Sequence, residues 1–266
     1  MNDAPLNVES IRSHLGGADR RIECVERTES TNDLVWRRAL EGAPEGMAVF
    51  AEEQTRGRGR FGRVWFAPPG RCLLGSVLLR PKVRFEEVNL VIAVGALAVV
   101  DALQETAGLA ATIRFPNDVM VGKRKISGTL VEARLISSAP DFFVVGIGVN
   151  VNLEQSEFPA DIRGDATSIL TETGRDTDRN RLAAALLSRL DAWEGELGTD
   201  AGREAIQKAW KARSALVGKR VEAREGGRAI RGRVEDVDVF KGLLVRTESG
   251  HLVHARAEHI EMVRIL

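Results

Sequence analysis

Runs of hydrophobic residues, and the polar residues between them, divide the chain into an ordered series of strands and helices. Short apolar runs predict strands at residues 21–25, 47–52, 73–79, 112–115 and 142–149, and a hairpin formed by residues 119–121 and 124–134. Helical spacing predicts helices at residues 8–15, 30–40, 88–103, 178–197 and 201–212. The helix at 88–103 is apolar almost all round, so we expect it at the centre of the core.

After about Val217 the pattern changes to short alternating strands. These are predicted at residues 219–224, 229–237, 242–247 and 250–255, with turns at Gly226-Gly227 and Ser249-Gly250. Such closely spaced strands are typical of a small β-barrel. We therefore expect an α+β fold, in which residues 1–214 form a mixed β-sheet with packed helices and residues 215–266 form a separate small β-barrel domain.

The composition narrows the class of protein. The 266 residues are 44% hydrophobic and 29% charged, which is ordinary for a soluble globular protein. Basic and acidic residues both number 38, so any basic binding site must be local. Cys24 and Cys72 form no CxxC pair, the N-terminus lacks an apolar signal core, and the longest apolar run, residues 90–100, is too short to span a membrane. We expect a cytoplasmic protein with free thiols.

The most concentrated basic segment runs from Gln54 to Trp65 and is called the arginine loop below. Four arginines fall within eight residues, at positions 56, 58, 60 and 63, and glycines separate them. Arginine matches phosphate and carboxylate groups, and glycine lets the backbone approach a ligand, so the arginine loop predicts an anion-binding site. It also satisfies GxGxxG, but Pro68-Pro69-Gly70 prevents the long helix that a dinucleotide site needs. Nucleic-acid binding and a solvated basic loop stay open as alternatives.

Other candidate positions lie at strand and helix ends. Asn117 and Asp118 follow Pro116, where they either form a turn or bind a polar ligand, directly or through Mg²⁺. Lys125 enters an otherwise apolar strand, either as a turn residue in solvent or as a charge directed at a ligand. Residues 30–32, Ser-Thr-Asn, are also typical of a simple helix cap.

Two glycines, Gly146 and Gly148, remove side chains from one face of a buried strand, which predicts a slot for a flat apolar ligand. Three histidines, at positions 251, 254 and 259, have no cysteine nearby and no helical ligand spacing, so we interpret them as surface residues rather than metal ligands.

In this order, the segments resemble the biotin–protein ligases. That family has a Ser-Thr-Asn helix start, a Gln-x-x-Gly-Arg-Gly-Arg-x-Gly-Arg-x-Trp loop, a Lys-Trp-Pro-Asn-Asp block, a Lys-x-x-Gly strand and a Gly-x-Gly-x-Asn strand end. The chain is similar at residues 30–32, 54–65, 114–118, 125–128 and 146–150. The resemblance covers residues 25–265 and implies a catalytic domain related to class II synthetases, followed by an SH3-like domain.

The resemblance also implies roles for individual residues. Lys125, Arg58 and Arg60 would be catalytic. The biotin site would comprise Ser30, Thr31, Asn32, Gln54, Gly57, Arg58, Lys125, Gly128, Gly146 and Gly148. The ATP and adenylate site would comprise Arg60, Arg63, Trp65, Arg114, Asn117, Asp118 and Asn150, with Asp118 as a candidate Mg²⁺ ligand.

Two departures from the family pattern are visible. Arg114-Phe115 stands where the family usually has Lys-Trp, which keeps a charge and an aromatic ring but loses the indole N–H. Arg56 stands where the family has a small residue, and the sequence does not say what it contacts.

The activity that the resemblance implies is ATP-dependent. Biotin would be activated as biotinyl-AMP with ATP and Mg²⁺, and then transferred to a lysine of a biotin carboxyl carrier acceptor domain. Some members carry an N-terminal DNA-binding domain; the segment before Ser30 is too short for one, so we expect a ligase that binds neither DNA nor membranes, as a monomer or homodimer. A lipoate–protein ligase, a nucleic-acid-binding module and a catalytically impaired relative stay open as alternatives.

Overall fold

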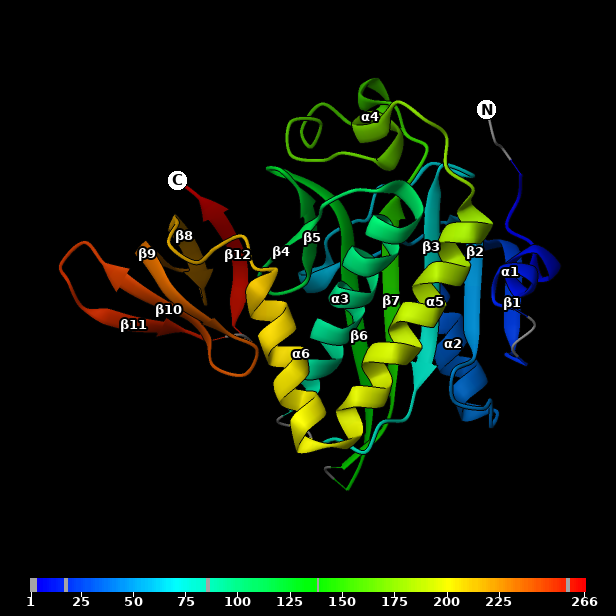
Figure 1. Ribbon diagram of the computed structural model, residues 1–266, viewed down its shortest axis with the longest axis horizontal. Coiled ribbons are helices and arrows are strands. Elements are labelled where there is room, and N and C mark those ends of the chain that lie inside the picture. The colour runs from blue at the N-terminus through cyan, green and yellow to red at the C-terminus, as the bar shows by residue number, and fades with distance from the viewer. Residues whose placement is uncertain (1–3, 17–18, 85–86, 138, 257–258) are drawn as a thin grey trace.

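The larger part of the molecule is built on a seven-stranded sheet in the order β1-β2-β3-β7-β6-β5-β4 (Figure 1). The computed structural model describes residues 4–16, 19–84, 87–137, 139–256 and 259–266. The strands of this sheet are β1 Ile22–Thr28, β2 Ala48–Gln54, β3 Cys72–Leu79, β4 Thr112–Arg114, β5 Asp118–Val121, β6 Arg124–Ile136 and β7 Ala139–Asn150.

The sheet is mixed because one of its pairings is parallel. β1 and β2 run parallel, and α2 (Thr31–Leu40) connects them, since parallel neighbours need a crossover. All the other neighbouring pairs of this sheet are antiparallel, including the long β6–β7 hairpin. The crossover brings α2 against β3 and β7, so its first turn lies near the middle of the sheet.

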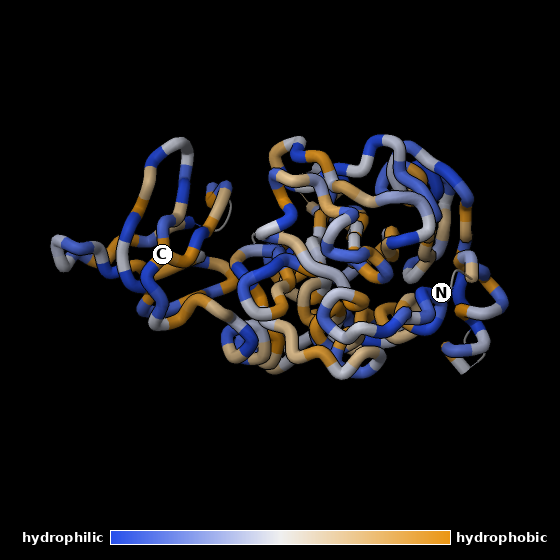
Figure 2. The backbone as a smooth tube through the Cα atoms, turned by 90° about the horizontal axis from the view of Figure 1, so that it is seen from above, coloured by the Kyte–Doolittle hydropathy of each residue, from blue (hydrophilic) through white to orange (hydrophobic). Residues whose placement is uncertain are grey.

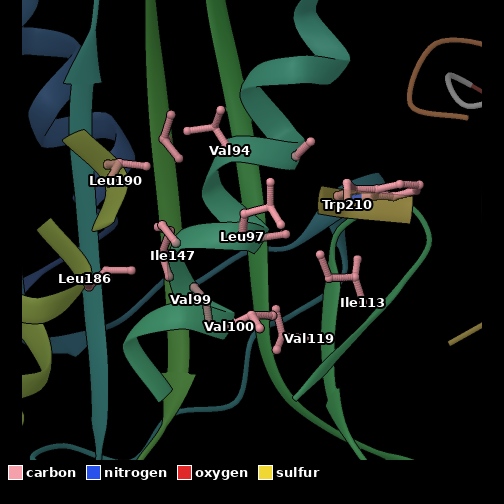
Figure 3. Close-up of a cluster of buried hydrophobic side chains, with 14 of the residues drawn as sticks. Val94, Leu97, Val99, Val100, Ile113, Val119, Ile147, Leu186, Leu190 and Trp210 are labelled. Atoms are coloured by element: carbon pink, nitrogen blue, oxygen red, sulfur yellow. The ribbon is translucent and has the colours of Figure 1, made fainter. Parts of the chain in front are cut away.

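One face of the sheet carries most of the core. The helices on this side are α1 (Val8–His14), α3 (Val88–Ala107), α5 (Arg179–Gly195) and α6 (Asp200–Ala212). Figure 1 shows α3, α5 and α6 lying across this face. In Figure 3 the side chains of Leu97 on α3, Ile147 on β7 and Trp210 on α6 gather in a single buried cluster. Alternate residues of β7, such as Val145 and Ile147, point into it.

The central helix α3 is as apolar as the sequence predicts. By length and composition it could cross a membrane, yet most of its residues are buried inside the protein. It extends to Ala107 and ends at Gly108, whose φ of 67° is the left-handed conformation that suits glycine at a helix end. Burial against the sheet and α5 therefore accounts for its composition, and its predicted place in the core is confirmed.

The opposite face of the sheet is only partly filled. Residues of α2 and β7, including Val35, Phe142 and Val144, form a small apolar cluster at one end, and a second cluster including Leu74 and Phe158 lies at the other. Between the two clusters this face presents small residues: Ser76 on β3, Gly128 on β6, and Gly146 and Gly148 on β7. The sequence therefore leaves an unfilled space on this face, beside the first turn of α2.

The smaller part of the molecule is an antiparallel five-stranded sheet in the order β11-β10-β9-β8-β12. Its strands are β8 Arg220–Glu225, β9 Arg228–Asp238, β10 Gly242–Thr247, β11 Leu252–Ala255 and β12 Ile260–Ile265. Figure 2 shows it beside the larger part, whose hydrophobic positions concentrate in the interior. This confirms the expected α+β class with a barrel-like C-terminal unit, whereas the boundary at 214/215 stays a prediction.

The smaller part is attached to the larger through α6. Lys211 forms an ion pair with Asp236 of β9 at 2.6 Å, and the Gln207 side chain accepts a hydrogen bond from the Val239 N–H at 2.9 Å. Residues 213–215 also pair with Ile113 of β4. The orientation of β12 relative to the large sheet is thus set by polar contacts as well as by the connecting chain.

Among the described α-helices and β-strands, two were not predicted: α4 (Ile169–Thr173) and β12. α4 is a single short turn that opens at the Ser168 cap. β12 has a bulge between Ile260 and Met262, so its buried positions, Ile260 and Val263, lie three residues apart. The bulge breaks the alternation on which a strand prediction depends.

Candidate active site

A cavity of about 540 Å³ occupies the unfilled space on the α2 side of the sheet. Its walls come from the first turn of α2, the arginine loop, the turn between β4 and β5, the strands β6 and β7, and β12. The predicted site residues that line it are Ser30, Thr31, Asn32, Gln54, Arg58, Arg60, Arg63, Trp65, Arg114, Asn117, Asp118, Lys125, Gly128, Gly146 and Gly148. Segments far apart in the sequence are therefore brought together around one space.

The arginine loop folds as a short hairpin over this cavity. Arg58 and Val64 form an antiparallel bridge, and the Gly59 N–H donates to the Arg63 carbonyl at 2.7 Å. The tip is a single turn at Arg60–Gly62, in which Phe61 has a φ of 58° and an exposed side chain. The next regular element is β3, antiparallel to β2, so the helix that a dinucleotide site requires does not follow the glycines.

Arg58 and Arg60 lie two residues apart but have opposite environments. The Arg58 guanidinium donates to both oxygens of Asp33, at 2.9 and 2.6 Å, and to Glu132 at 3.1 Å. The hydrogen bond to Asp33 is the largest cause of a raised pKa for Arg58, and the same contact lowers the pKa of Asp33. Two carboxylates already pair with this guanidinium in this conformation, and the expected contact of Arg58 with a substrate anion stays a prediction.

Arg60, by contrast, has no ion-pair partner within the described residues. Its guanidinium lies 4.9 Å from the centre of the exposed Phe61 ring. Burial lowers the pKa of Arg60, although the carboxylate of Asp118 partly opposes this effect. A partly buried cation without a bound counter-charge is well suited to receive an anion, so Arg60 is available to a ligand.

The remaining two arginines of the loop contact neighbouring parts of the chain. Arg56 forms an exposed ion pair with Glu29 at 3.3 Å, which answers what this additional charge touches. Arg63 donates to the backbone carbonyl of Glu261 on β12 at 3.2 Å. The arginine loop is therefore connected to the segment before α2 on one side and to the C-terminal unit on the other.

Ser30, Thr31, Asn32 and Gln54 form what is called here the polar end of the cavity. Ser30 occupies the cap position of α2, but its side chain makes no capping hydrogen bond. Instead the Gln54 side-chain oxygen accepts from the Thr31 N–H at 2.7 Å and from the Thr31 hydroxyl at 3.0 Å. Simple capping therefore does not explain the Ser-Thr-Asn sequence, and the Gln54 amide nitrogen is not used in these two bonds.

Arg60, Arg114 and Lys125 form the basic end, grouped around Asp118. The Lys125 Nζ lies 2.5 Å from one oxygen of Asp118, and Arg114 donates to the other at 2.8 Å. Burial raises the pKa of Asp118, but Lys125 and then Arg114 outweigh it and hold the pKa below its usual value. Lys125 is thus neither a solvent-exposed turn residue nor an isolated charge, because a carboxylate fixes it beside the cavity.

The three glycines of the cavity floor accommodate side chains of the protein itself. A Cβ on Gly146 would lie 2.1 Å from the Asn32 side-chain oxygen, and one on Gly148 would lie 2.6 Å from the Trp65 ring. A Cβ on Gly128 would lie 3.1 Å from the Lys125 Nζ. The slot expected over Gly146 and Gly148 is therefore partly taken by Asn32 and Trp65, which form walls of the cavity.

Two predicted site residues lie outside the cavity lining, and a third is bound to the sheet. Asn150 is buried, and its amide donates to the Thr167 carbonyl at 2.9 Å. Gly57 lies behind Trp65, whose backbone N–H donates to the Gly57 carbonyl. Asn117 lines the cavity, but its amide donates to the Thr129 carbonyl at 2.7 Å. The structure therefore assigns Asn150 to holding the loop after β7.

The site offers no protein cage for a metal ion. In the described ranges, no group of three or more His, Cys, Asp or Glu side chains could hold a metal. The three histidines at positions 251, 254 and 259 are all exposed. Both oxygens of Asp118 already accept contacts from cations. A divalent ion on the same carboxylate would face two positive charges, so these residues do not fit a protein-held Mg²⁺ site.

Sequence reasoning missed several residues of the site. Ser76 on β3 donates within the polar end, Asp33 and Glu132 hold Arg58, and β12 supplies residues 261–264 to the lining. A carboxylate at position 132, in a strand that is otherwise largely apolar, was a signal that could have been noticed. No signal in the sequence indicated the contribution of β12, because the strand itself was not predicted.

Comparison with known proteins assigns this architecture to a family. A profile of the Biotin/lipoate A/B protein ligase family matches residues 24–150. The chain is 35% identical over 240 residues to the biotin–[acetyl-CoA-carboxylase] ligase of Paracoccus denitrificans, covering 87% of this chain and 97% of that protein. It is 32% identical over 275 residues to the Mycobacterium tuberculosis enzyme of the same name, covering 95% and 97%.

A solved structure agrees with the sequence relatives. The biotin protein ligase of Aquifex aeolicus, in complex with biotin and ATP, superposes with a TM-score of 0.79 at 29% identity, over 92% of this chain and 99% of that one. The chain therefore belongs to the biotin–protein ligases, within the biotin/lipoate A/B protein ligase family.

Proposed function

We infer that this chain is an ATP-dependent ligase, which activates biotin as biotinyl-AMP and transfers it to a lysine of a biotin carboxyl carrier domain. The observation that carries the proposal is the cavity itself. At the polar end, Asn32 lies over Gly146 of β7. At the basic end, Lys125 lies over Gly128 of β6, which pairs with Gly148, two residues further along β7. A ligand with a neutral polar head and a carboxylate at its far end fits this order of groups.

The polar end offers donors suited to a ureido carbonyl. Gln54 keeps its oxygen turned toward Thr31, which leaves its amide N–H groups as donors. The Ser30 side chain lines the cavity beside them and makes no capping hydrogen bond to α2. Biotin carries such a carbonyl in its ring and lipoate does not, so this end of the cavity favours biotin.

The basic end meets the needs of the first half-reaction. A biotin carboxylate oxygen attacks the α-phosphorus of ATP, a P–O bond to the β-phosphate breaks, and pyrophosphate leaves. Two anions must come together in this step, and Arg60, Lys125 and Arg114 bring three positive charges, which outnumber the carboxylates of Asp118 and Asp165 in this part of the lining. The net positive charge stabilises the transition state, where negative charge accumulates.

In the second half-reaction the amine of the acceptor lysine attacks the acyl carbon. AMP leaves with the bonding electrons of the anhydride, and the new amide nitrogen loses a proton. No Ser or Cys nucleophile of the enzyme is needed, because the adenylate is already an activated acyl donor. The arginine loop and β12 lie over the cavity, where they limit the access of water to the adenylate.

Mg²⁺ belongs to this proposal as a companion of the nucleotide. Mg²⁺ keeps several waters and binds phosphate oxygens readily, so we expect triphosphate and water to supply most of its ligands. The acceptor is proposed to be the carrier domain of a carboxylase. We further propose that the chain acts without DNA, as a monomer or a homodimer.

The test is incubation of the purified protein with ATP, Mg²⁺, biotin and a carboxyl carrier domain. The expected result is a gain of one biotin on the carrier by intact mass, together with pyrophosphate release that requires biotin. Lipoate is supplied in a parallel reaction. Modification by lipoate but not biotin would replace this proposal with the lipoate alternative, and modification by neither would refute ligase activity toward both.

A further inference from the structure

Glu132 lies at the junction between the arginine loop and the polar end. It is on the cavity side of β6, and its side chain is 33% exposed. One of its oxygens accepts from the Arg58 guanidinium at 3.1 Å, and the other accepts from the Asn32 amide nitrogen at 2.6 Å. A single carboxylate therefore binds the first arginine of the hairpin and the first turn of α2 at the same time.

The contact to Asn32 continues into the cavity wall. The Asn32 oxygen accepts from the Ser76 hydroxyl at 2.6 Å, and the same hydroxyl lies 2.7 Å from the Thr31 hydroxyl oxygen. Both ends of the Asn32 amide are thereby used within the protein, and its oxygen fills the space above Gly146. Asn32 is consequently a wall of the polar end whose orientation Glu132 and Ser76 determine, rather than a free group for a ligand.

The two sides of the hairpin are held differently. The Arg58 side is bound by two carboxylates on two different elements, Asp33 on α2 and Glu132 on β6. On the opposite side, Arg63 donates one hydrogen bond to a backbone carbonyl at an exposed position, and the Trp65 ring packs against the sheet above Gly148. Charge-assisted hydrogen bonds are stronger than neutral ones, so the polar attachment is stronger on the Arg58 side.

We propose that Glu132 is a positioning residue for the ligase reaction. It holds Arg58 of the arginine loop and Asn32 of the cavity wall to one point on β6, which keeps the loop over the cavity between the two half-reactions. It is not among the residues that line the cavity, so it acts through Arg58 and Asn32. This inference rests on the proposed function, because its readout is retention of the adenylate.

The test compares Glu132→Ala and Glu132→Gln with the parent protein. Glutamine has almost the shape of glutamate and can still accept from Asn32, so it removes mainly the charge that attracts Arg58. For Glu132→Ala we expect release of biotinyl-AMP from the enzyme to accelerate about tenfold, as follows from losing charged hydrogen bonds. Glu132→Gln should show a smaller acceleration, and adenylate formation should stay within about threefold in both variants.

A matched control is available on the same loop. Glu29 forms an ion pair with Arg56, but both side chains are exposed and neither lines the cavity. Glu29→Gln therefore removes one carboxylate charge that pairs with the arginine loop, as Glu132→Gln does, and we expect parental release of the adenylate. Trypsin treatment adds a second readout, because a loosened loop with four arginines should be cut faster in the Glu132 variants than in Glu29→Gln.

The outcomes are separable. Parental adenylate retention in Glu132→Ala would overturn the proposal, as would equal acceleration in Glu29→Gln. Formation and retention that decline together in the folded fraction would also overturn it, because that result indicates general damage. A parent protein that forms no adenylate at all would refute the proposed function instead.

Discussion

The two faces of the seven-stranded sheet are made by the same strands but have opposite properties. On the α3 side, β7 presents Val145 and Ile147, which are packed under α3. On the α2 side, the same strand presents Gly146 and Gly148, over which the cavity lies. Neighbouring residues of one strand thus serve stability and binding separately. Substitutions on the two faces should accordingly change different measured quantities.

The largest expected effect is on the cavity face, at Lys125. Removing its ammonium leaves Asp118 with one cation fewer and lowers the positive charge at the basic end. We expect Lys125→Ala to slow biotin-dependent pyrophosphate release by roughly 10²- to 10³-fold, as for other residues that stabilise transition-state charge. The melting temperature serves as the control. Release at the parental rate would show that Lys125 only neutralises Asp118.

The corresponding test of the opposite face is Leu97→Ala. Leu97 is fully buried between α3 and the sheet, as Figure 3 shows. Its truncation should lower the free energy of unfolding by about 2–5 kcal/mol, measured by urea denaturation. The KM values for biotin and ATP should stay parental at a temperature where the variant is folded. A changed KM with intact stability would contradict the separation of the two faces.

A smaller effect is expected at Gly148. A methyl group here would lie 2.6 Å from the Trp65 ring, so the indole must move. We expect Gly148→Ala to raise the KM for biotin about tenfold, which corresponds to about 1.4 kcal/mol, and to shift the fluorescence of the displaced tryptophan. An unchanged spectrum and an unchanged KM would show that the floor tolerates a side chain.

The smallest effect concerns the pH dependence of stability. Arg58 lowers the pKa of Asp33 below its usual value of 3.8, so the charged form is favoured in the folded state. The resulting stabilisation is present at pH values above 3.8 and is lost as the pH falls through the lowered folded pKa. The stability difference between the parent and Asp33→Asn should therefore be largest near neutral pH and should shrink in acid. Because Asp33 is 46% exposed, we expect this difference to be small.

That difference can be measured by urea denaturation of both proteins at several pH values. A stability difference that grows in acid would contradict the assigned role of Asp33.

Cys24 allows a separate prediction, since burial and then Glu52 raise the pKa of its thiol to about 11. It should therefore react slowly with an alkylating agent near neutral pH.

The sequence was sufficient for most elements of the larger part, because each obeys a simple period. α3 is apolar throughout, and β3 and β7 are continuous apolar runs, so their positions could be predicted within a few residues. The end of α3 was placed too early, since the residues between positions 103 and 107 are only partly apolar. β12 was missed because a bulge breaks its alternation.

The site was only partly predictable, for a different reason. Arg58 and Arg60 have nearly the same sequence context, each following a glycine, and nothing local distinguishes their roles. The difference arises from Asp33 and Glu132, which lie far from Arg58 in the chain and meet it only in the folded protein. Asn150 is a different case, because this motif position donates to the Thr167 carbonyl and so holds a neighbouring loop.

The participation of β12 in the cavity has a consequence for the biosynthesis of the protein. Residues 261–264 come after every other lining residue in the chain, and Arg63 donates to one of them. Synthesis proceeds from the N-terminus, so the large sheet can fold while β12 is still inside the ribosome. A nascent chain at that stage has a pocket open on one side, and it should gain the ability to retain its reactive intermediate only after β12 has emerged from the exit tunnel.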